Sequence, residues 1–282
     1  MSLTKRNRSP MQHRKIAFIG AGNMSRSIIS GMVSSGYPAE AITAANPSRP
    51  KLDALSNDFG INITQDNLEA VRNAEVVVLA VKPQLMEEVC KHLQQADLNG
   101  KLFVSIAAGI KAARLQQMLG GDYPLVRTMP NTPSALGKGM TGLYADSQVS
   151  DTDRSFAGDL LGQVGDVAWV DEEDMINGVI AAAGSSPAYF FLFLESMQDE
   201  ALRMGFDRET SRKLVQQACL GAAEMVCQNQ DLELSELRAQ VTSKAGTTAA
   251  ALNHFEDNGI RELVSGAMQA AVTRAKEMSD EF

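Results

Sequence analysis

Hydroxyl side chains cluster in the segment VTSKAGTTAAAL. Four of them, Thr242, Ser243, Thr247 and Thr248, lie within seven residues, and Gly246 precedes an alanine-rich run that is typical of a helix. Free backbone N–H groups and hydroxyls at the start of a helix attract anions. The segment therefore predicts a binding site for a small molecule that carries a carboxylate.

A second candidate site is the sequence GAGNMS at Gly20–Ser25, between an apolar run and a predicted helix. Gly20 permits a tight turn, and Gly22 lets the backbone approach a pyrophosphate. The start of the next helix supplies N–H groups, and Ser25 replaces the usual third glycine with another small residue. This pattern predicts a dinucleotide site, and an ordinary glycine-rich turn is the alternative.

The sequence Asn46-Pro47-Ser48-Arg49 bears on the choice of cofactor. Sites that prefer NAD usually carry an acidic residue here, which holds the ribose diol. No carboxylate is present, and Ser48 and Arg49 are suited to a 2′-phosphate. The pattern favours NADPH, with NADH still possible and a plain turn with a solvated arginine as the alternative.

Strands and helices that alternate along the first part of the chain must position these residues. Such alternation predicts a mostly parallel, doubly wound α/β sheet with helices on both faces. The predicted strands are Lys15–Gly20, Ile42–Asn46, Ile61–Thr64, Val76–Val81, Leu102–Ile106 and Leu125–Met129. Gly139–Tyr144 and Val167–Val170 are expected to add edge strands, and the predicted helices are Asn23–Ser35 and Pro50–Asp58.

Three more loops follow predicted strands of this sheet, at Ala80–Pro83, Ile106–Gly109 and Met129–Pro133. The carboxyl edge of a parallel sheet is where such folds bind ligands. Simple turn chemistry explains any one of these loops, but three in series favour a binding edge.

From Asp171 onward the strand pattern stops and an all-α region is predicted. Its helices are Pro187–Met204, Asp207 to about Gln228, Ser235–Val241, Thr247–Asp257 and Gly259–Met278. We therefore predict a loose tail over 1–14, a dinucleotide-binding domain over 15–170 and a helical domain over 171–282. Small residues on the helices favour close contact within or between subunits.

Composition narrows the possible partners. The net charge of −8 argues against nucleic acid. Uninterrupted apolar runs such as Ala188–Leu194 are too short to cross a membrane. The three cysteines form no CxxC pair, which suits a reducing cytoplasm, and the three histidines show no metal-ligand spacing.

The chain resembles the pyrroline-5-carboxylate reductase family. The resemblance extends from Lys15 to about Met278 and rests on six segments: FIGAGNM, AVKPQ, SIAAG, MPNTP, GSSPAY and VTSKAGTT. It implies an N-terminal Rossmann domain and a helical dimerisation and substrate-binding domain. Dimers of the family often assemble further into rings.

The resemblance also implies roles for individual residues. The pyrophosphate would be held by Gly20, Gly22, Asn23 and Met24, and the adenosine ribose would lie beside Ser48 and Arg49. The nicotinamide side would be lined by Asn67, Ala80, Val81, Lys82 and Pro83, with Ile106, Ala107 and Ala108 nearby. The substrate would be bound by Ser243, Gly246, Thr247 and Thr248. Thr248 is the candidate catalytic residue, since its hydroxyl can orient the substrate ring. Lys244 and Ala245 depart from the Pro-Gly of the family, and alanine resists a positive φ.

The implied activity is that of an oxidoreductase in amino-acid biosynthesis. It would transfer a hydride from NADPH to 1-pyrroline-5-carboxylate and so form proline in the cytoplasm, without metal. One alternative is a related imine or β-hydroxyacid reductase, although the usual catalytic lysine is missing from Asp171–Met204. Another is a non-catalytic NADP-binding paralogue.

Overall fold

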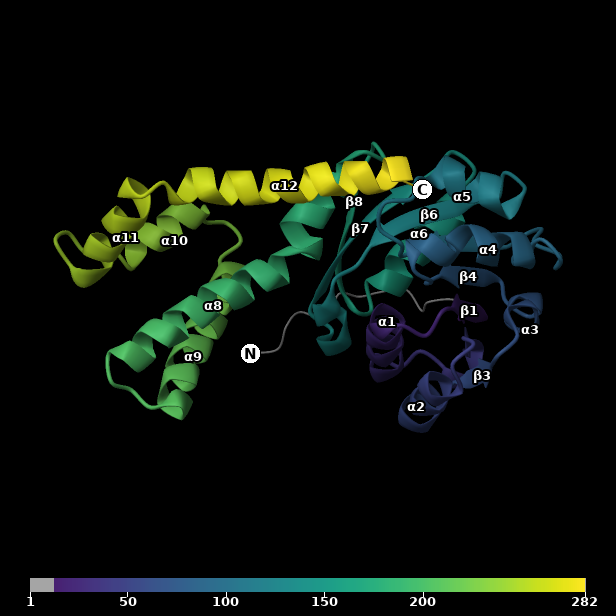
Figure 1. The fold of residues 1–282 in the computed structure, drawn as a ribbon, viewed down its shortest axis with the longest axis horizontal. Helices are drawn as coiled ribbons and strands as arrows, with labels where there is room; N and C mark the ends of the chain where they lie inside the picture. Colours follow the sequence, from purple (N-terminus) through teal and green to yellow (C-terminus); the bar gives the residue numbers. More distant parts are fainter. Residues whose placement is uncertain (1–12, 282) are drawn as a thin grey trace. The chain divides into compact units, whose positions relative to one another are not determined.

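The computed structural model describes residues 13–281, which form two units (Figure 1). One unit holds the described residues up to Ser185 and those from Ala271 onward; the other is Ser186–Ala270. Most of the predicted tail, residues 1–12, lies outside the described residues. Arg14 is held by the sheet unit, since its Nη1 lies 2.6 Å from Asp153 Oδ1.

The sheet unit is built on one eight-stranded sheet. Its strands are β1 (Ile16–Ile19), β2 (Ile42–Ala45), β3 (Asn62–Thr64), β4 (Val76–Leu79), β5 (Leu102–Ser105), β6 (Leu125–Met129), β7 (Gly139–Ala145) and β8 (Gly165–Trp169). They lie in the order β3-β2-β1-β4-β5-β6-β7-β8, and every neighbouring pair is parallel except β6 and β7. The predicted fold class is confirmed.

Helices cover both faces of this sheet because the side chains of its strands alternate between two cores. Ile16 and Phe18 face one core, and Ala17 and Ile19 face the other. The first core contains residues of α1 (Asn23–Ser34), α2 (Arg49–Phe59) and α6 (Asp151–Leu161). The second contains residues of α3 (Asn67–Arg72), α4 (Pro83–Leu93) and α5 (Ala112–Leu119).

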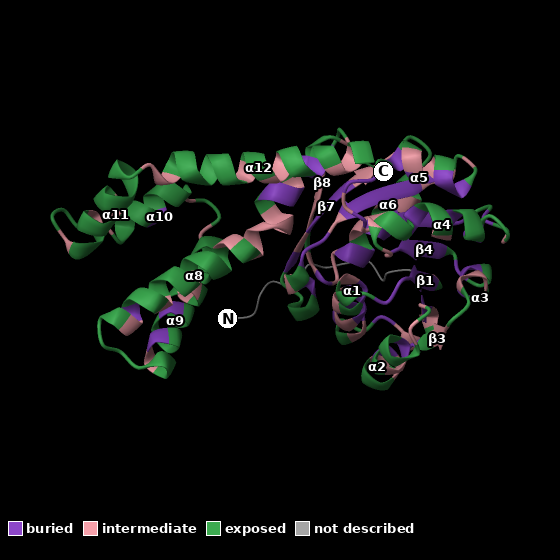
Figure 2. Ribbon diagram, viewed as in Figure 1, coloured by how far each residue is buried: buried purple, intermediate pink, exposed green. Residues whose placement is uncertain are grey.

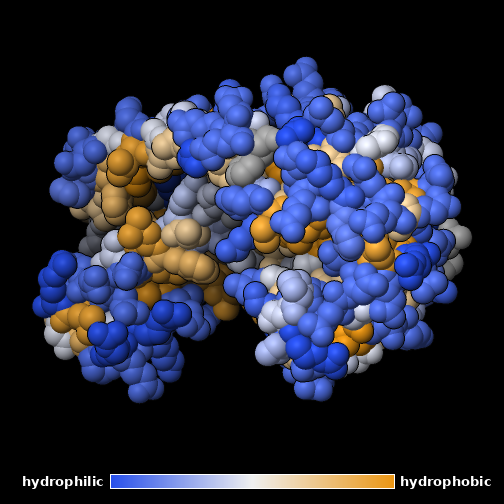
Figure 3. Space-filling view, turned by 45° about the vertical axis from the view of Figure 1, so that its right-hand side comes forward, coloured by the Kyte–Doolittle hydropathy of each residue, from blue (hydrophilic) through white to orange (hydrophobic). Residues whose placement is uncertain are grey.

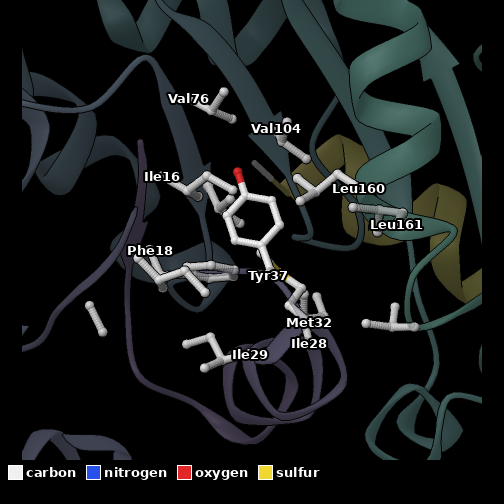
Figure 4. Packing of buried hydrophobic residues seen from close by; sticks show 14 of the residues in the cluster. Ile16, Phe18, Ile28, Ile29, Met32, Tyr37, Val76, Val104, Leu160 and Leu161 are labelled. Carbon is white, nitrogen blue, oxygen red and sulfur yellow. The ribbon is translucent and has the colours of Figure 1, made fainter. Parts of the chain in front are cut away.

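Figure 4 shows the first core around Tyr37, whose ring lies among Ile16, Phe18, Met32 and Leu160. Burial raises the pKa of Tyr37 to about 12. Its hydroxyl donates a hydrogen bond to the carbonyl of Arg14 at 2.7 Å, so the polar end of the ring is satisfied.

Past β8, the chain continues to pack on the sheet. The helix α7 (Met175–Val179) and the π-helix η3 (Ile180–Gly184) contribute Ile176 and Ile180 to a small third core. Val170 and Ala275 complete it. By its contacts, the chain between β8 and Ser185 therefore groups with the sheet unit, because these turns bury their apolar side chains against the sheet. Two short 3₁₀ helices, η1 (Ala39–Ala41) and η2 (Thr132–Leu136), serve as connectors.

The second unit is all-α. It contains α8 (Ser186–Arg203), α9 (Arg208–Gln228), α10 (Leu234–Gln240), α11 (Thr247–Asp257) and the first part of α12 (Ile260–Glu281). Local signals set these limits. Gly205, at φ +99°, follows the end of α8, and the Asp207 side chain caps α9 by accepting the Thr210 N–H at 2.8 Å.

The helical unit leaves much apolar surface exposed (Figures 2 and 3). Exposed side chains on α8 include Phe190, Phe191, Leu192 and Phe193. By length and composition alone, the continuous helical stretch Met175–Arg203 is apolar enough to cross a membrane. Its most apolar segment of 18 residues has a mean hydropathy of 1.3 and is 22% buried.

Candidate functional site

The first loop of the sheet unit is shaped by Gly20. Its φ is +114°, and a Cβ there would lie 2.6 Å from the carbonyl oxygen of Ala80. Glycine is therefore required both by conformation and by the close approach of the β4–α4 loop. The site lies between β1 and β4, where the strand order reverses, which is where doubly wound sheets bind nucleotides.

The N-terminus of α1 is open for an anion. Gly22 is its N-cap, and apart from its two chain neighbours no described residue has an atom within 4 Å of the place where a Gly22 Cβ would be. The first intrahelical bond runs from Arg26 N–H to Gly22 O, so the N–H groups of Asn23 and Met24 precede it. With no acidic residue in its first turn, this helix start fits a pyrophosphate.

The side chains of Ser25 and Asn46 hold this loop in place by hydrogen bonds. The sequence did not predict a hydrogen-bonding role for either of them. Ser25, in place of the third glycine, is buried and donates its hydroxyl to Gly20 O at 2.7 Å. Asn46 Oδ1 accepts the Ala21 N–H at 3.3 Å and so links the first and second loops. The only sequence signal was a polar residue at each of these positions.

The second loop leads into α2, whose first turn is basic. Ser48 is the N-cap, and Arg49 and Lys51 follow with no acidic residue in the first turn. Cations are unfavourable at a helix N-terminus, so this arrangement suits an anionic ligand. Arg49 is 59% exposed, and its Nε lies 2.7 Å from Asp53 Oδ1 one turn further on. Asn67 is half-buried at the start of α3.

The remaining candidate cofactor loops follow β4 and β5 at the same edge. Ala80 N–H donates to Ile19 O at 2.9 Å, and Ile106 N–H donates to Leu79 O at 3.2 Å. Lys82 is the exposed N-cap of α4 and Pro83 is its first residue. The candidate cofactor residues that follow these two strands are Ala80, Val81, Lys82, Pro83, Ile106, Ala107 and Ala108, so the structure brings them to one edge with Gly20.

The loop Met129–Pro133 follows β6, and its asparagine is occupied by structural contacts. Asn131 Nδ2 donates to Ala183 O at 3.0 Å, and Asn131 Oδ1 accepts the Met140 N–H at 2.9 Å. This side chain therefore links the β6–β7 connection to the π-helix. A structural role in the turn is enough to explain the asparagine at this position.

The candidate anion loop lies in the helical unit. Gly246 is the N-cap of α11, and the first intrahelical bond runs from Ala250 N–H to Gly246 O at 3.1 Å. The N–H groups of Thr247 and Thr248 precede that bond. A Cβ at Gly246 would lie 2.4 Å from Ser243 Oγ, so only glycine lets the Ser243 side chain sit over this helix start.

The departure at Lys244-Ala245 is accommodated within this loop. Ala245 has φ +57°, the left-handed conformation that glycine adopts more readily. The turn closes with Gly246 N–H donating to Ser243 O at 3.0 Å. Alanine thus takes up the positive φ that it was expected to resist.

The hydroxyls of the segment differ in availability. Thr242 donates to Arg238 O at 2.6 Å and so belongs to the end of α10. In the region that the structure describes, the hydroxyls of Ser243, Thr247 and Thr248 have no hydrogen-bond partner within the chain. Three exposed hydroxyls and free helix N–H groups can bind a carboxylate. Among residues 13–281, no group of three or more His, Cys, Asp and Glu could hold a metal ion.

Comparison with known families matches both units. Residues 173–278 match the model described as pyrroline-5-carboxylate reductase dimerisation. Residues 15–109 match that described as NADP oxidoreductase coenzyme F420-dependent.

Individual relatives align over almost the whole chain. A pyrroline-5-carboxylate reductase of Vibrio alginolyticus is 57% identical over 272 residues, which cover 96% of this chain and 100% of the relative. The structure of a pyrroline-5-carboxylate reductase from Coxiella burnetii matches with a TM-score of 0.89 and 40% identity, covering 95% and 99% of the two chains. That of Plasmodium falciparum pyrroline carboxylate reductase with NADP bound matches with a TM-score of 0.85 and 29% identity, covering 95% and 99%.

Proposed function

Because the chain belongs to the pyrroline-5-carboxylate reductase family, it is an NADP-dependent oxidoreductase that reduces 1-pyrroline-5-carboxylate to proline, and we propose residue roles on that premise. The observation that carries the activity is the 57% identity along the full length of a relative with that name. The alternatives of a β-hydroxyacid or other imine reductase and of a non-catalytic paralogue are set aside.

We propose that the edge loops of the sheet unit hold NADPH. The uncapped start of α1 supports binding of the pyrophosphate by Gly20, Gly22, Asn23 and Met24. The basic first turn of α2 supports binding of the 2′-phosphate by Ser48 and Arg49. The residues proposed for the nicotinamide side are Asn67, Ala80, Val81, Lys82, Pro83, Ile106, Ala107 and Ala108.

We propose that the substrate binds at the N-terminus of α11. The free N–H groups of Thr247 and Thr248, with the Ser243 hydroxyl and the close turn at Gly246, suit its carboxylate. The Thr248 hydroxyl would hydrogen-bond the ring nitrogen or the carboxylate and so orient the ring.

The chemistry asks little of protein acids or bases. When bound, NADPH supplies the hydride that reduces the carbon of the C=N bond. The imine nitrogen is basic enough to take up a proton near neutral pH, and the side chains then contribute orientation and the exclusion of water. A steady-state assay tests the function: NADPH oxidation must depend on 1-pyrroline-5-carboxylate. The six-membered piperideine carboxylate, run in parallel, tests the choice of ring.

Replacing Arg49 with alanine should weaken NADPH binding by about 1–2 kcal/mol, the size of a charge-assisted contact, and leave NADH binding nearly unchanged. Titration of each variant with both cofactors measures this. Asp53→Ala is the matched control, since it removes the side chain that pairs with Arg49 and keeps the guanidinium. An equal loss for both cofactors in the Arg49 variant would show that Arg49 does not bind the 2′-phosphate.

The dimerisation domain indicates a homodimer, and we propose that dimers assemble further into rings. The support is the group of exposed apolar side chains on α8 and its neighbours, which suits contact with other subunits. Sedimentation at micromolar concentration should give a mass more than twice the 30.3 kDa of one chain. A mass of twice that value would show a dimer that does not assemble into rings. A compact monomer with full activity would contradict this assembly.

We also propose a cytoplasmic location. The three cysteines, Cys90, Cys219 and Cys227, are free thiols, which suits a reducing compartment. Burial raises the pKa of Cys90 to about 12, so this thiol stays protonated at neutral pH.

A further inference from the structure

The loop between β5 and α5, residues 106–111, lacks a local cap where it enters the helix. Lys111 is the N-cap of α5, and among the described residues its own side chain makes no capping hydrogen bond. The Ala112 N–H is satisfied instead from far along the chain, since Glu173 Oε1 accepts it at 2.7 Å. A carboxylate at this position also stabilises the helix dipole. Glu173 therefore fixes the end of this loop.

Glu173 is itself held by a buried cation. Arg127 on β6 is 1% exposed, and its Nη1 donates to the same Oε1 atom of Glu173 at 3.1 Å. Within residues 13–281, Nε and Nη2 of Arg127 have no hydrogen-bond partner. The guanidinium thus depends on Glu173 for its compensating charge, which keeps the carboxylate at this place.

The other side of the loop is closed by the end of α12. Gly109 has φ +82°, and a Cβ there would lie 2.8 Å from Met278 Cβ. Ala275 is buried in the small third core, against which Ala108 packs. The loop is therefore held between a carboxylate at its helical end and a helix along its side.

A neighbouring ion pair is a weaker restraint. Lys111 Nζ lies 3.0 Å from Asp174 Oδ1, but the two side chains are 50% and 67% exposed. Exposed pairs of this kind contribute little. The restraint on the loop thus comes mainly from Glu173.

We propose that Glu173, held by Arg127, is a positioning residue for hydride transfer, because it fixes the loop that carries Ile106, Ala107 and Ala108. This inference rests on the proposed placement of those three residues on the nicotinamide side. Their loop affects the reaction through the position of the nicotinamide and not through the affinity for the rest of the cofactor.

The test compares Glu173→Ala with Glu173→Gln in the full-length enzyme. Glu173→Ala should lower kcat by roughly tenfold to a hundredfold, the effect of a misplacement of about 1 Å, and change the KM for NADPH by less than about threefold. The isotope effect on kcat, measured with NADPH deuterated at the transferred position, should rise. Glu173→Gln should lower kcat less than Glu173→Ala, because its Oε1 can still accept from both donors although the charge that compensates Arg127 is lost.

Asp153→Ala is the matched structural control. It breaks the ion pair between Arg14 and Asp153 of α6, whose side chains are only 14% and 22% exposed, without touching the loop. This variant should lower Tm and leave kcat and the isotope effect unchanged. This control separates the effect of a less stable enzyme from the effect of a displaced β5–α5 loop.

If Glu173→Ala does not fold, the double variant Arg127→Met/Glu173→Leu can be used, because it removes both charges and fills their place with apolar side chains. Proteins often tolerate such a replacement of a buried ion pair. It should show the same loss of kcat. Wild-type kcat and isotope effect in either folded variant, or equal losses in Glu173→Gln and Glu173→Ala, would overturn the proposal. The proposed function is tested separately by the turnover of the wild-type enzyme. The inference depends only on the ratio of the variant kcat to the wild-type kcat.

Discussion

Gly20→Ala is expected to lower the affinity of the folded enzyme for NADPH by about a hundredfold and to destabilise the sheet unit by about 3 kcal/mol. The added Cβ would lie 2.6 Å from the Ala80 carbonyl oxygen at a φ of +114°, so the two loops must move apart. Cofactor titration gives the affinity, and thermal unfolding gives the stability.

Two other glycines separate the effects combined at Gly20. Gly22→Ala adds a methyl group where no described residue except its chain neighbours lies within 4 Å, at an ordinary φ of −82°. It should leave the Tm of the free enzyme unchanged and weaken NADPH binding, because the methyl group occupies the space proposed for the pyrophosphate. Gly36→Ala, at φ +97° and also in open space, should lower Tm alone. Normal NADPH binding by the Gly22 variant would show that this turn does not hold the pyrophosphate.

Thr248→Val should lower kcat/KM for 1-pyrroline-5-carboxylate by roughly tenfold to a hundredfold, and Thr248→Ser should lower it much less. Valine keeps the shape and removes the hydroxyl, whereas serine keeps the hydroxyl. NADPH binding should be unchanged in both variants, because the role proposed for this residue concerns the substrate alone. Initial rates and cofactor titration on the same preparations measure these quantities.

The competing explanation is that Thr248 stabilises the helix by capping it. In the structure the N-cap of α11 is Gly246, and Thr248 lies two residues inside the helix. We therefore expect Thr248→Val to leave Tm nearly unchanged. A Tm lowered by the equivalent of about 1 kcal/mol with normal kinetics would favour the capping role instead.

The sequence predicted those parts of the fold that depend on local pattern. The strands β1 and β4, with their neighbours, read as short apolar runs, and α11 begins and ends at the predicted residues Thr247 and Asp257. Periodicity and caps are local properties of the chain. The antiparallel direction of β7 could not be predicted in this way, because it depends on the path of the connection after β6.

The candidate site was predictable in its loops but not in the contacts that hold them. Gly20 and Gly22 stand out because their spacing has a physical reason. The bond from Ala112 N–H to Glu173, 61 residues away, has no sequence signal, since it depends on how α7 packs against the sheet. The positive φ of Ala245 also contradicts the preference of its residue type, because turn closure outweighs that preference.

The sheet unit is discontinuous along the chain, and this has a consequence for its synthesis. Residues from Ala271 onward are translated after the whole helical unit, yet they supply Ala275 and Met278 beside the β5–α5 loop. The nascent chain can pair all eight strands while this flank of the sheet is still exposed to the ribosome surface and to chaperones. A fragment that ends at residue 170 or 185 would carry the same exposed flank permanently. An isolated nucleotide-binding half therefore needs the last turns of α12 grafted back by a linker.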